Sequence, residues 1–264
     1  CSRYGIAPQS FQPWTTMLFS LLTIAIAIPQ AHAFDHSHAA FSKVLSGAVE
    51  AGRVDYALIK TREAALDGYV ESFAAADIQT FDTNESLAFW INAYNAITIS
   101  VIVDAMPVQS IRDIDEGGVW DSRTFSLGGE QLTLNQIGHH KLHPAKDPRI
   151  HAAINCASNG CPPLPSDVFK AQTIDPQLDA ATKAWITTNA YTATNSKLTL
   201  SQIFEWYGTD FATANKGDIP GVEGPAEAAL WFISHHVDPA TAKRLTTTTW
   251  EATFIEYDWG LNTK

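Results

Sequence analysis

Two cysteines and one histidine in the segment 147–164 carry the side chains best suited to covalent chemistry. The segment reads DPRIHAAINCASNGCPPL and contains His151, Cys156 and Cys161. A cysteine attacks as its thiolate, which needs an adjacent imidazole or a positive backbone environment to form near neutral pH. We take Cys161 as the candidate nucleophile, His151 as the candidate general base and acid, and Cys156 as the neighbouring thiol.

The preference for Cys161 comes from the side-chain parity of a short buried strand expected over residues 149–156. Successive side chains of a strand point to opposite faces, so His151 and Cys156 should point apart. Cys161 lies beyond the turn 158–160 and is expected to fold back to the His151 side. This geometry favours Cys161 as the partner of the imidazole.

Other polar groups are assigned supporting roles at this candidate site. Successive N–H groups of the turn Ser158-Asn159-Gly160 are expected to stabilise a thiolate and then an oxyanion. Asn92 and Asn95 stand three apart on one helix, where one amide would hold the His151 ring, or both would instead bond loop backbone. Arg149 would fix the turn into the strand or hold a substrate carboxylate.

Two other uses of the cysteines stay open. Cys156 and Cys161 are close enough in sequence to form a disulfide, which would stabilise the fold by roughly 2 kcal/mol on the chain-entropy model. Alternatively, His139 and His143 lie one helical turn apart and could join both cysteines as four zinc ligands. We otherwise expect no metal and no cofactor.

Four stretches together resemble the family called domain of unknown function 547: LAFWINAYNAITI, DPRIHAAINCASNGCPPL, LTLSQIFEWYGTDF and YDWGLN. They occur in the expected order between about Leu87 and Asn262. The resemblance implies a bacterial domain without assigned chemistry and a fold similar to papain-like cysteine peptidases. It places the family's cysteine and histidine on His151, Cys156 and Cys161, and its asparagine-bearing helix on Asn92 and Asn95.

The chain departs from the family pattern at two places. Where the family tends to have Ile-Glu-His before Leu-Arg, Gly138 replaces the glutamate and His143 replaces the arginine. Ala152 replaces an aromatic residue after His151. If the glutamate serves catalysis, the first departure would impair activity.

Hydrophobic spacing and turn residues predict the elements that position these groups. Residues 81–107 contain the most distinctive helix, with Thr83 or Asn84 as N-cap and Pro107 beyond its end; it is apolar on nearly every face and therefore buried. Gly128-Gly129 predicts a hairpin, residues 197–211 a strand running into a helix capped by Ser201, and 247–259 a final strand. The fold class is α+β: a helix-rich single domain around a small, mainly antiparallel β-sheet.

The termini and the charge bear on location and partners. The apolar run and the Ala31-His32-Ala33 site predict a signal peptide in residues 1–33, followed by a flexible leader over 34–40 and one globular domain of this family over 41–264. We expect a periplasmic or secreted protein without an integral membrane segment in its mature chain. Its formal charge of −11 argues against a nucleic-acid partner.

The main hypothesis is an exported thiol-dependent enzyme that hydrolyses an amide or peptide bond, or transfers its acyl group, by a Cys-His mechanism. It would resemble a cysteine peptidase-like hydrolase or an acyltransferase and act on a small peptide or thiol-containing ligand. The alternatives are a non-catalytic binding or scaffold domain stapled by a disulfide, and a thiol-redox or zinc site.

Overall fold

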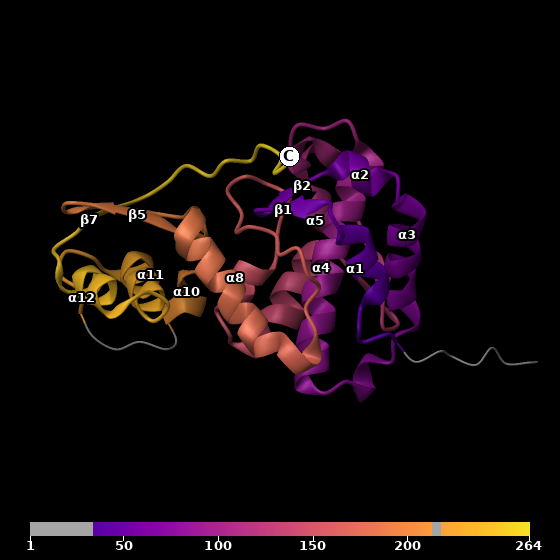
Figure 1. Ribbon diagram of the computed structural model, residues 1–264, viewed down its shortest axis with the longest axis horizontal. Coiled ribbons are helices and arrows are strands. Elements are labelled where there is room, and N and C mark those ends of the chain that lie inside the picture. The colour runs from indigo at the N-terminus through magenta and orange to yellow at the C-terminus, as the bar shows by residue number, and fades with distance from the viewer. Residues whose placement is uncertain (1–33, 213–217) are drawn as a thin grey trace, which may run out of the picture. The chain divides into compact units, whose positions relative to one another are not determined.

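The computed structural model describes residues 34–212 and 218–264. Helical residues make up 56% and strand residues 11%, which confirms the helix-rich α+β class (Figure 1). The predicted signal peptide, residues 1–33, lies outside the described residues. The α-helices are, in chain order, α1 (Ala39–Leu45), α2 (Tyr56–Lys60), α3 (Glu63–Ser72), α4 (Thr83–Ala105), α5 (Val119–Ser122), α6 (Leu134–Gln136), α7 (Ile150–Ala153), α8 (Ile174–Thr188), α9 (Gln202–Trp206), α10 (Gly208–Phe211), α11 (Gly224–Ser234) and α12 (Pro239–Thr247).

Short strands and single helical turns fill the connections between these helices. The strands are β1 (Val49–Glu50), β2 (Arg53–Val54), β3 (Phe125–Leu127), β4 (Glu130–Leu132), β5 (Tyr191–Thr194), β6 (Lys197–Leu200) and β7 (Glu251–Phe254). The helical turns are η1 (Phe73–Ala75), η2 (Ile78–Thr80), η3 (Ile111–Gly117), η4 (Ile137–Leu142, a π-helix), η5 (His143–Ala145) and η6 (Ala171–Thr173).

The described strands form three small sheets rather than the single sheet expected. Strands β1 and β2 pair antiparallel, as do β3 and β4. In the third sheet, β6 pairs antiparallel with β5 and parallel with β7. The β3–β4 pair confirms the hairpin predicted at Gly128 and Gly129, whose φ angles of 56° and 82° suit residues without a Cβ atom.

Helix α4 is the central buried element, as its apolar pattern predicts. It begins with a capping box in which Asp82 accepts from the Glu85 N–H and Glu85 accepts from the Asp82 N–H. The helix is long and apolar enough to cross a membrane, but 89% of its most hydrophobic window is buried inside the protein. That burial is typical of a core helix.

The segment 34–40 differs from the flexible leader expected there. The Phe34 ring packs 5.0 Å from Phe89 and 6.1 Å from Phe73, and His38 is 1% exposed. The His38 ring bonds to the Tyr69 hydroxyl at 2.6 Å. This segment is ordered because its aromatic rings join the core beside α4.

The segment after β7 brings the end of the chain back to the first hairpin (Figure 1). Thr263 forms a parallel bridge with Val54, and Leu261 forms an antiparallel bridge with Ser158. Residues far apart in sequence are thereby fixed around the cysteine loop, with Tyr257 on the same returning segment.

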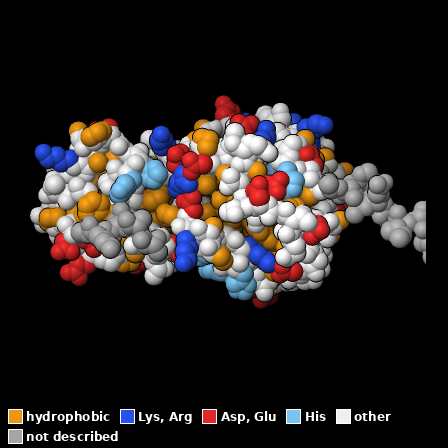
Figure 2. Space-filling model, turned by 90° about the horizontal axis from the view of Figure 1, so that it is seen from below, with side chains coloured by type: hydrophobic (Ala, Val, Ile, Leu, Met, Phe, Trp, Pro, Cys, Tyr) orange, Lys and Arg blue, Asp and Glu red, His pale blue; other side chains and the backbone are white. Residues whose placement is uncertain are grey.

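Charged side chains of both signs are interspersed on the face drawn in Figure 2.

Candidate functional site

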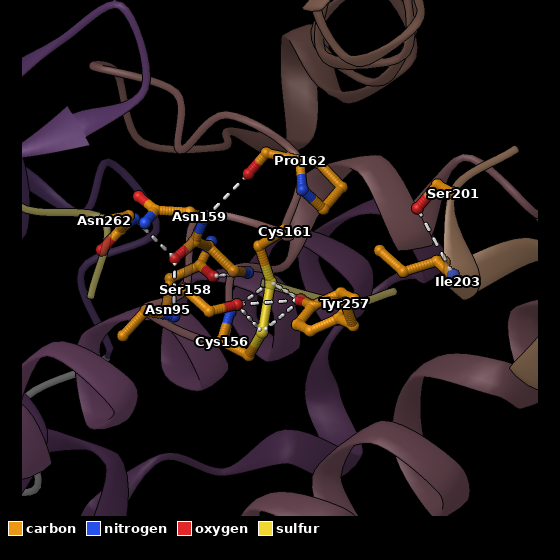
Figure 3. Close-up of a disulfide and its surroundings, with 12 residues drawn as sticks. Asn95, Cys156, Ser158, Asn159, Cys161, Pro162, Ser201, Ile203, Tyr257 and Asn262 are labelled. Atoms are coloured by element: carbon orange, nitrogen blue, oxygen red, sulfur yellow. Dashed lines mark hydrogen bonds between the residues drawn. A yellow bond between two sulfur atoms is a disulfide. The ribbon is translucent and has the colours of Figure 1, made fainter. Parts of the chain in front are cut away.

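The two cysteines of the loop 156–161 form a disulfide, which Figure 3 shows beside Tyr257. Asn155 fixes the start and the end of the loop, because its Nδ2 donates to the Pro162 carbonyl and its Oδ1 accepts from the Ala157 N–H, both at 2.8 Å. The Asn262 side chain donates to the same Oδ1 at 3.1 Å. The loop is held by its own buried amide and by the end of the chain.

Two hydrogen-bond donors converge on the sulfur of Cys161. The backbone N–H of Cys156 lies 2.9 Å from it and the Tyr257 hydroxyl 3.1 Å. The same hydroxyl lies 3.0 Å from the Cys156 sulfur and 2.9 Å from the Ser158 hydroxyl. Donors at these distances stabilise a thiolate on Cys161 once the disulfide is reduced, because hydrogen bonds to the charged form favour it.

The turn 158–160 does not provide the anion site expected of it. The N–H of Asn159 donates to the Gly260 carbonyl and that of Gly160 to the Asp258 carbonyl. The Ser158 hydroxyl bonds to the Tyr257 hydroxyl. These groups are used by the returning C-terminal segment. The prediction that N–H groups of this turn stabilise a thiolate and an oxyanion is therefore wrong for Asn159 and Gly160.

His151 lies on α7, a helical turn, and not on the strand predicted for residues 149–156. The Asp147 side chain accepts from the Arg149 N–H, and the Asp147 carbonyl accepts from the Ile150 N–H, so Asp-Pro-Arg starts a helical turn. The alternation of faces used to separate His151 from Cys156 does not apply, because side chains of a helical turn follow a different spacing.

A carboxylate holds the imidazole of His151. Nε2 lies 2.8 Å from Oδ2 of Asp210, which is on α10, and the ring packs 4.4 Å from Tyr207 and 5.1 Å from Phe211. The His151 bond holds the pKa of Asp210 below its usual range, so the carboxylate is ionised and accepts the bond. In the neutral imidazole Nε2 then carries the hydrogen, which leaves Nδ1 as the basic atom.

Burial keeps this imidazole neutral. His151 is 3% exposed, and its desolvation lowers its pKa, although the bond to Asp210 acts in the opposite direction. A neutral imidazole at neutral pH is the form that accepts a proton from a thiol. The geometry and the pKa direction both suit a general base.

Asn92 and Asn95 bond to loop backbone and do not hold the imidazole. The side chain of Asn92 donates to the carbonyl and accepts from the N–H of Phe169. Asn95 donates to the Ala153 carbonyl and accepts from the Asn155 N–H. The expectation that one of them orients His151 is wrong, because α4 packs both amides against the backbone of neighbouring loops.

Arg149 is bound by carboxylates of the chain itself. Its guanidinium contacts Asp147 at 2.7 Å, Asp175 at 2.8 Å and Asp179 at 2.7 Å. The predicted role in fixing the local turn agrees with the Asp147 contact. The predicted role in holding a substrate carboxylate is not supported, since three acids already satisfy this cation.

The disulfide and His151 line one pocket of about 290 Å³. Six of its thirteen lining residues are aromatic: Tyr94, Trp120, Trp206, Tyr207, Tyr257 and Trp259. Among the described residues no hydrogen bond joins Cys161 to His151, and the sulfur is bonded to Cys156. The pocket therefore brings together the candidate nucleophile and base in an oxidised form of the site.

The described metal-ligating groups differ from the zinc set predicted as an alternative. That set needs both cysteines as thiolates, whereas here they are bonded to each other. His143, His151 and Asp210 instead bring their ligand atoms within 4.8 Å of one another. Two imidazoles and a carboxylate suit a divalent transition metal. In the structure Asp210 bonds to His151 Nε2 at 2.8 Å, and its carboxylate lies 3.4 Å from His143 Nδ1.

The departure at Gly138 leaves space in the structure. Gly138 is buried in η4, yet a Cβ atom placed on it would meet nothing within 4 Å. This position therefore has room for a Cβ atom. A carboxylate for the imidazole comes from Asp210 instead.

One comparison with known proteins gives a match. Residues 78–186 match the model of a family described as protein of unknown function, DUF547. This stretch is similar to that family. It contains α4 and the cysteine loop, and so confirms the resemblance inferred from those motifs. No curated protein and no solved structure matches the chain.

Important parts of the site lie outside residues 78–186, and the sequence analysis did not find them. Asp210 is 59 residues from His151, and Tyr257 is 101 residues from Cys156. Trp206 is 47% exposed and lines the pocket. The one available signal was that Asp210 and Tyr257 fall inside two of the motifs that carried the resemblance.

Proposed function

We propose that the protein is a thiol-dependent enzyme that transfers or hydrolyses an acyl group at an amide or ester bond, with Cys161 as nucleophile and His151 as base. Asp210 is its positioning residue. The observation that carries the proposal is the 2.8 Å bond from His151 to Asp210 in the pocket that Cys161 also lines. A Cys-His pair oriented by a third polar group is the arrangement that covalent acyl transfer requires.

The chemistry starts with reduction of the disulfide by a dithiol, which is itself oxidised to a disulfide. The Cys161 thiol then gives its proton to Nδ1 of His151, and its thiolate attacks the acyl carbon. The imidazolium returns the proton to the leaving amine or alcohol as the acyl–nitrogen or acyl–oxygen bond breaks. A thioester on Cys161 remains, and water or another nucleophile, deprotonated by His151, releases the acid or the transferred acyl group.

Each named residue has a separate task in these steps. Tyr257 and the Cys156 N–H stabilise the Cys161 thiolate by hydrogen bonds. Asp210 fixes the imidazole tautomer and stabilises the imidazolium that forms. Tyr207 and Phe211 hold the ring by packing.

We also propose that the protein acts in the periplasm or outside the cell. The apolar run before Ala33 and the disulfide support this location, since disulfides persist in oxidising compartments. A cysteine peptidase-like reaction, as the papain-like resemblance suggested, is one form of the proposed acyl transfer.

The test is to trap the acyl-enzyme. The reduced protein is mixed with p-nitrophenyl acetate, and peptide mass spectrometry locates the acetyl group. We expect acetylation at Cys161, retained in Cys156→Ser and slowed by about 100-fold or more in His151→Ala. Acetylation confined to Cys156, or an equal rate in His151→Ala, would show that the proposed pair does not act together.

A second function is favoured by the disulfide itself. Thiol-disulfide exchange would use the same two sulfurs, with an external thiolate attacking one sulfur and the other leaving as a thiolate stabilised by Tyr257. Rapid equilibration of the bridge with a glutathione buffer, together with no acetylation of reduced Cys161, would favour this function. A disulfide that does not exchange with the glutathione buffer, in a protein whose reduced Cys161 is not acetylated by p-nitrophenyl acetate, would favour a non-catalytic scaffold domain held by the disulfide.

A further inference from the structure

The lining of the pocket limits the kind of acyl group that fits it. Among the residues that the structure describes, the thirteen that line the pocket include no Lys, Arg, Asp or Glu. A charged substrate group would lose its hydration here without gaining an opposite charge from the lining.

Aromatic rings form one continuous wall of the pocket. The Trp206 ring packs 4.8 Å from Tyr257 and 5.9 Å from Trp259, and Tyr257 packs 4.5 Å from Trp259. Trp206 nevertheless keeps 47% of its surface exposed. A large apolar side chain that lines a pocket and remains half open offers a face on which another ring can stack.

Three polar side chains of the lining are already bonded within the protein. The Asn135 side chain donates to Asp121, and the Tyr94 hydroxyl bonds to the Trp120 side chain. The Tyr257 hydroxyl bonds to the Ser158 hydroxyl. A sugar would need several such partners for its hydroxyl groups. Ile154, Ile203 and Pro162 add aliphatic surface, so the described lining favours an apolar ligand.

We propose that this pocket binds an uncharged aromatic side chain next to the acyl carbon, as in amides or esters of phenylalanine-like acids. The volume of about 290 Å³ suits one ring-bearing group. Trp206 is the specificity-determining residue, because its open face meets the ring. The assignment of this group to the acyl side of the substrate depends on the function proposed above, whereas its binding does not.

Binding is tested in the full-length oxidised protein, where the disulfide prevents acyl transfer. The probes are N-acetylphenylalaninamide, N-acetylglycinamide, N-acetyllysinamide and the N-acetyl amide of glutamate, each measured by calorimetry and by saturation-transfer NMR. We expect the phenylalanine probe to bind at least tenfold more tightly than the other three. Equal binding of the glycine, lysine or glutamate probe would overturn the proposed ligand class.

Variants at two exposed apolar positions locate the binding face. Trp206→Ala should weaken binding of the phenylalanine probe about tenfold, and Trp206→Phe should retain most of it because a ring remains. Ile255→Ala is the matched control, since Ile255 is also exposed, at 54%, but does not line the pocket. An effect of Ile255→Ala equal to that of Trp206→Ala would contradict the assignment.

These outcomes separate the ligand proposal from the proposed function. Tight phenylalanine binding without acetylation of reduced Cys161 would support the pocket assignment and reject the acyl-transfer function. Acetylation of Cys161 without preference among the four probes would do the reverse.

Discussion

The side chain of His151 donates from Nε2 to the Asp210 carboxylate at 2.8 Å, and it lines the same pocket as the Cys156–Cys161 disulfide. This pair comes from two helical turns, α7 and α10, that are 59 residues apart in sequence. It selects the imidazole tautomer whose Nδ1 is basic. The proposed thiol-dependent activity depends on this hydrogen bond between His151 and Asp210.

Replacement of Asp210 should change both the rate and the pH dependence of Cys161 acetylation. Asp210 raises the pKa of His151 against the effect of burial, so Asp210→Asn should move the acid limb of the rate profile to lower pH. The maximal rate should fall by about 10²–10⁴ because the imidazolium loses its counter-ion. Rate measurements across pH on reduced protein check this.

The control for Asp210 is Glu251→Gln, which removes one negative charge from strand β7. It should leave the acid limb in place. A shift of equal size in both variants would mean that overall charge, and not the His151 contact, sets the profile.

Replacement of Tyr257 should weaken the thiolate of Cys161. Tyr257→Phe removes a hydroxyl that lies 3.1 Å from the sulfur, and a hydrogen bond to a charged group contributes about 1.5–3 kcal/mol. We expect the pKa of the Cys161 thiol to rise by about one unit or more, measured from alkylation rates against pH. Tyr191→Phe, on strand β5, should leave these rates unchanged.

Acidification should destabilise the fold through His38. Burial lowers the pKa of His38 from 6.5 to about 4. The unfolded chain binds this proton first, so the His38 contribution is complete above pH 6.5 and is lost as the pH falls toward 4. The loss should reach about 3 kcal/mol in the free energy of unfolding.

Urea unfolding of His38→Gln at pH 7 and pH 5 measures this contribution. The variant should lose less stability between these pH values than the wild type does, whereas His235→Gln, at an exposed histidine, should behave like the wild type. The same pH dependence in His38→Gln and wild type would rule out His38 as its source.

Asn95 is expected to act on stability and not on the imidazole. Asn95→Ala leaves a buried carbonyl at Ala153 and a buried N–H at Asn155 without partners, at a cost of about 2–4 kcal/mol. Urea unfolding gives this cost, and Asn84→Ala, exposed near the start of the same helix, is the control. The pH profile of Cys161 acetylation should not shift. A shift would restore Asn95 to the group that orients His151.

Elements with strong local patterns were predictable from sequence. The nearly continuous apolar surface of residues 83–105 predicted a buried helix, and Gly128-Gly129 predicted the β3–β4 hairpin. The helical turn at His151 was missed because its four residues are too few for a periodic pattern, and Ile150 to Ile154 read equally well as a strand.

Only part of the candidate site could be predicted from the sequence. His151, Cys156 and Cys161 lie within eleven residues of one another and share one local motif. Asp210 and Tyr257 reach them through tertiary contacts, for which residue spacing gives no signal. The backbone partners of the turn 158–160 come from the returning C-terminal segment for the same reason.

In the proposed mechanism, reduced Cys161 forms a thiolate with the help of His151. This step is tested most directly by titrating thiolate absorbance at 240 nm in the variant Cys1→Ser/Cys156→Ser, in which Cys161 is the single thiol among three original cysteines. We expect a Cys161 pKa well below the ordinary value of about 8.5, and a rise of that pKa when His151→Ala is added. A pKa at or above the ordinary value, unchanged by His151→Ala, would contradict the proposed mechanism.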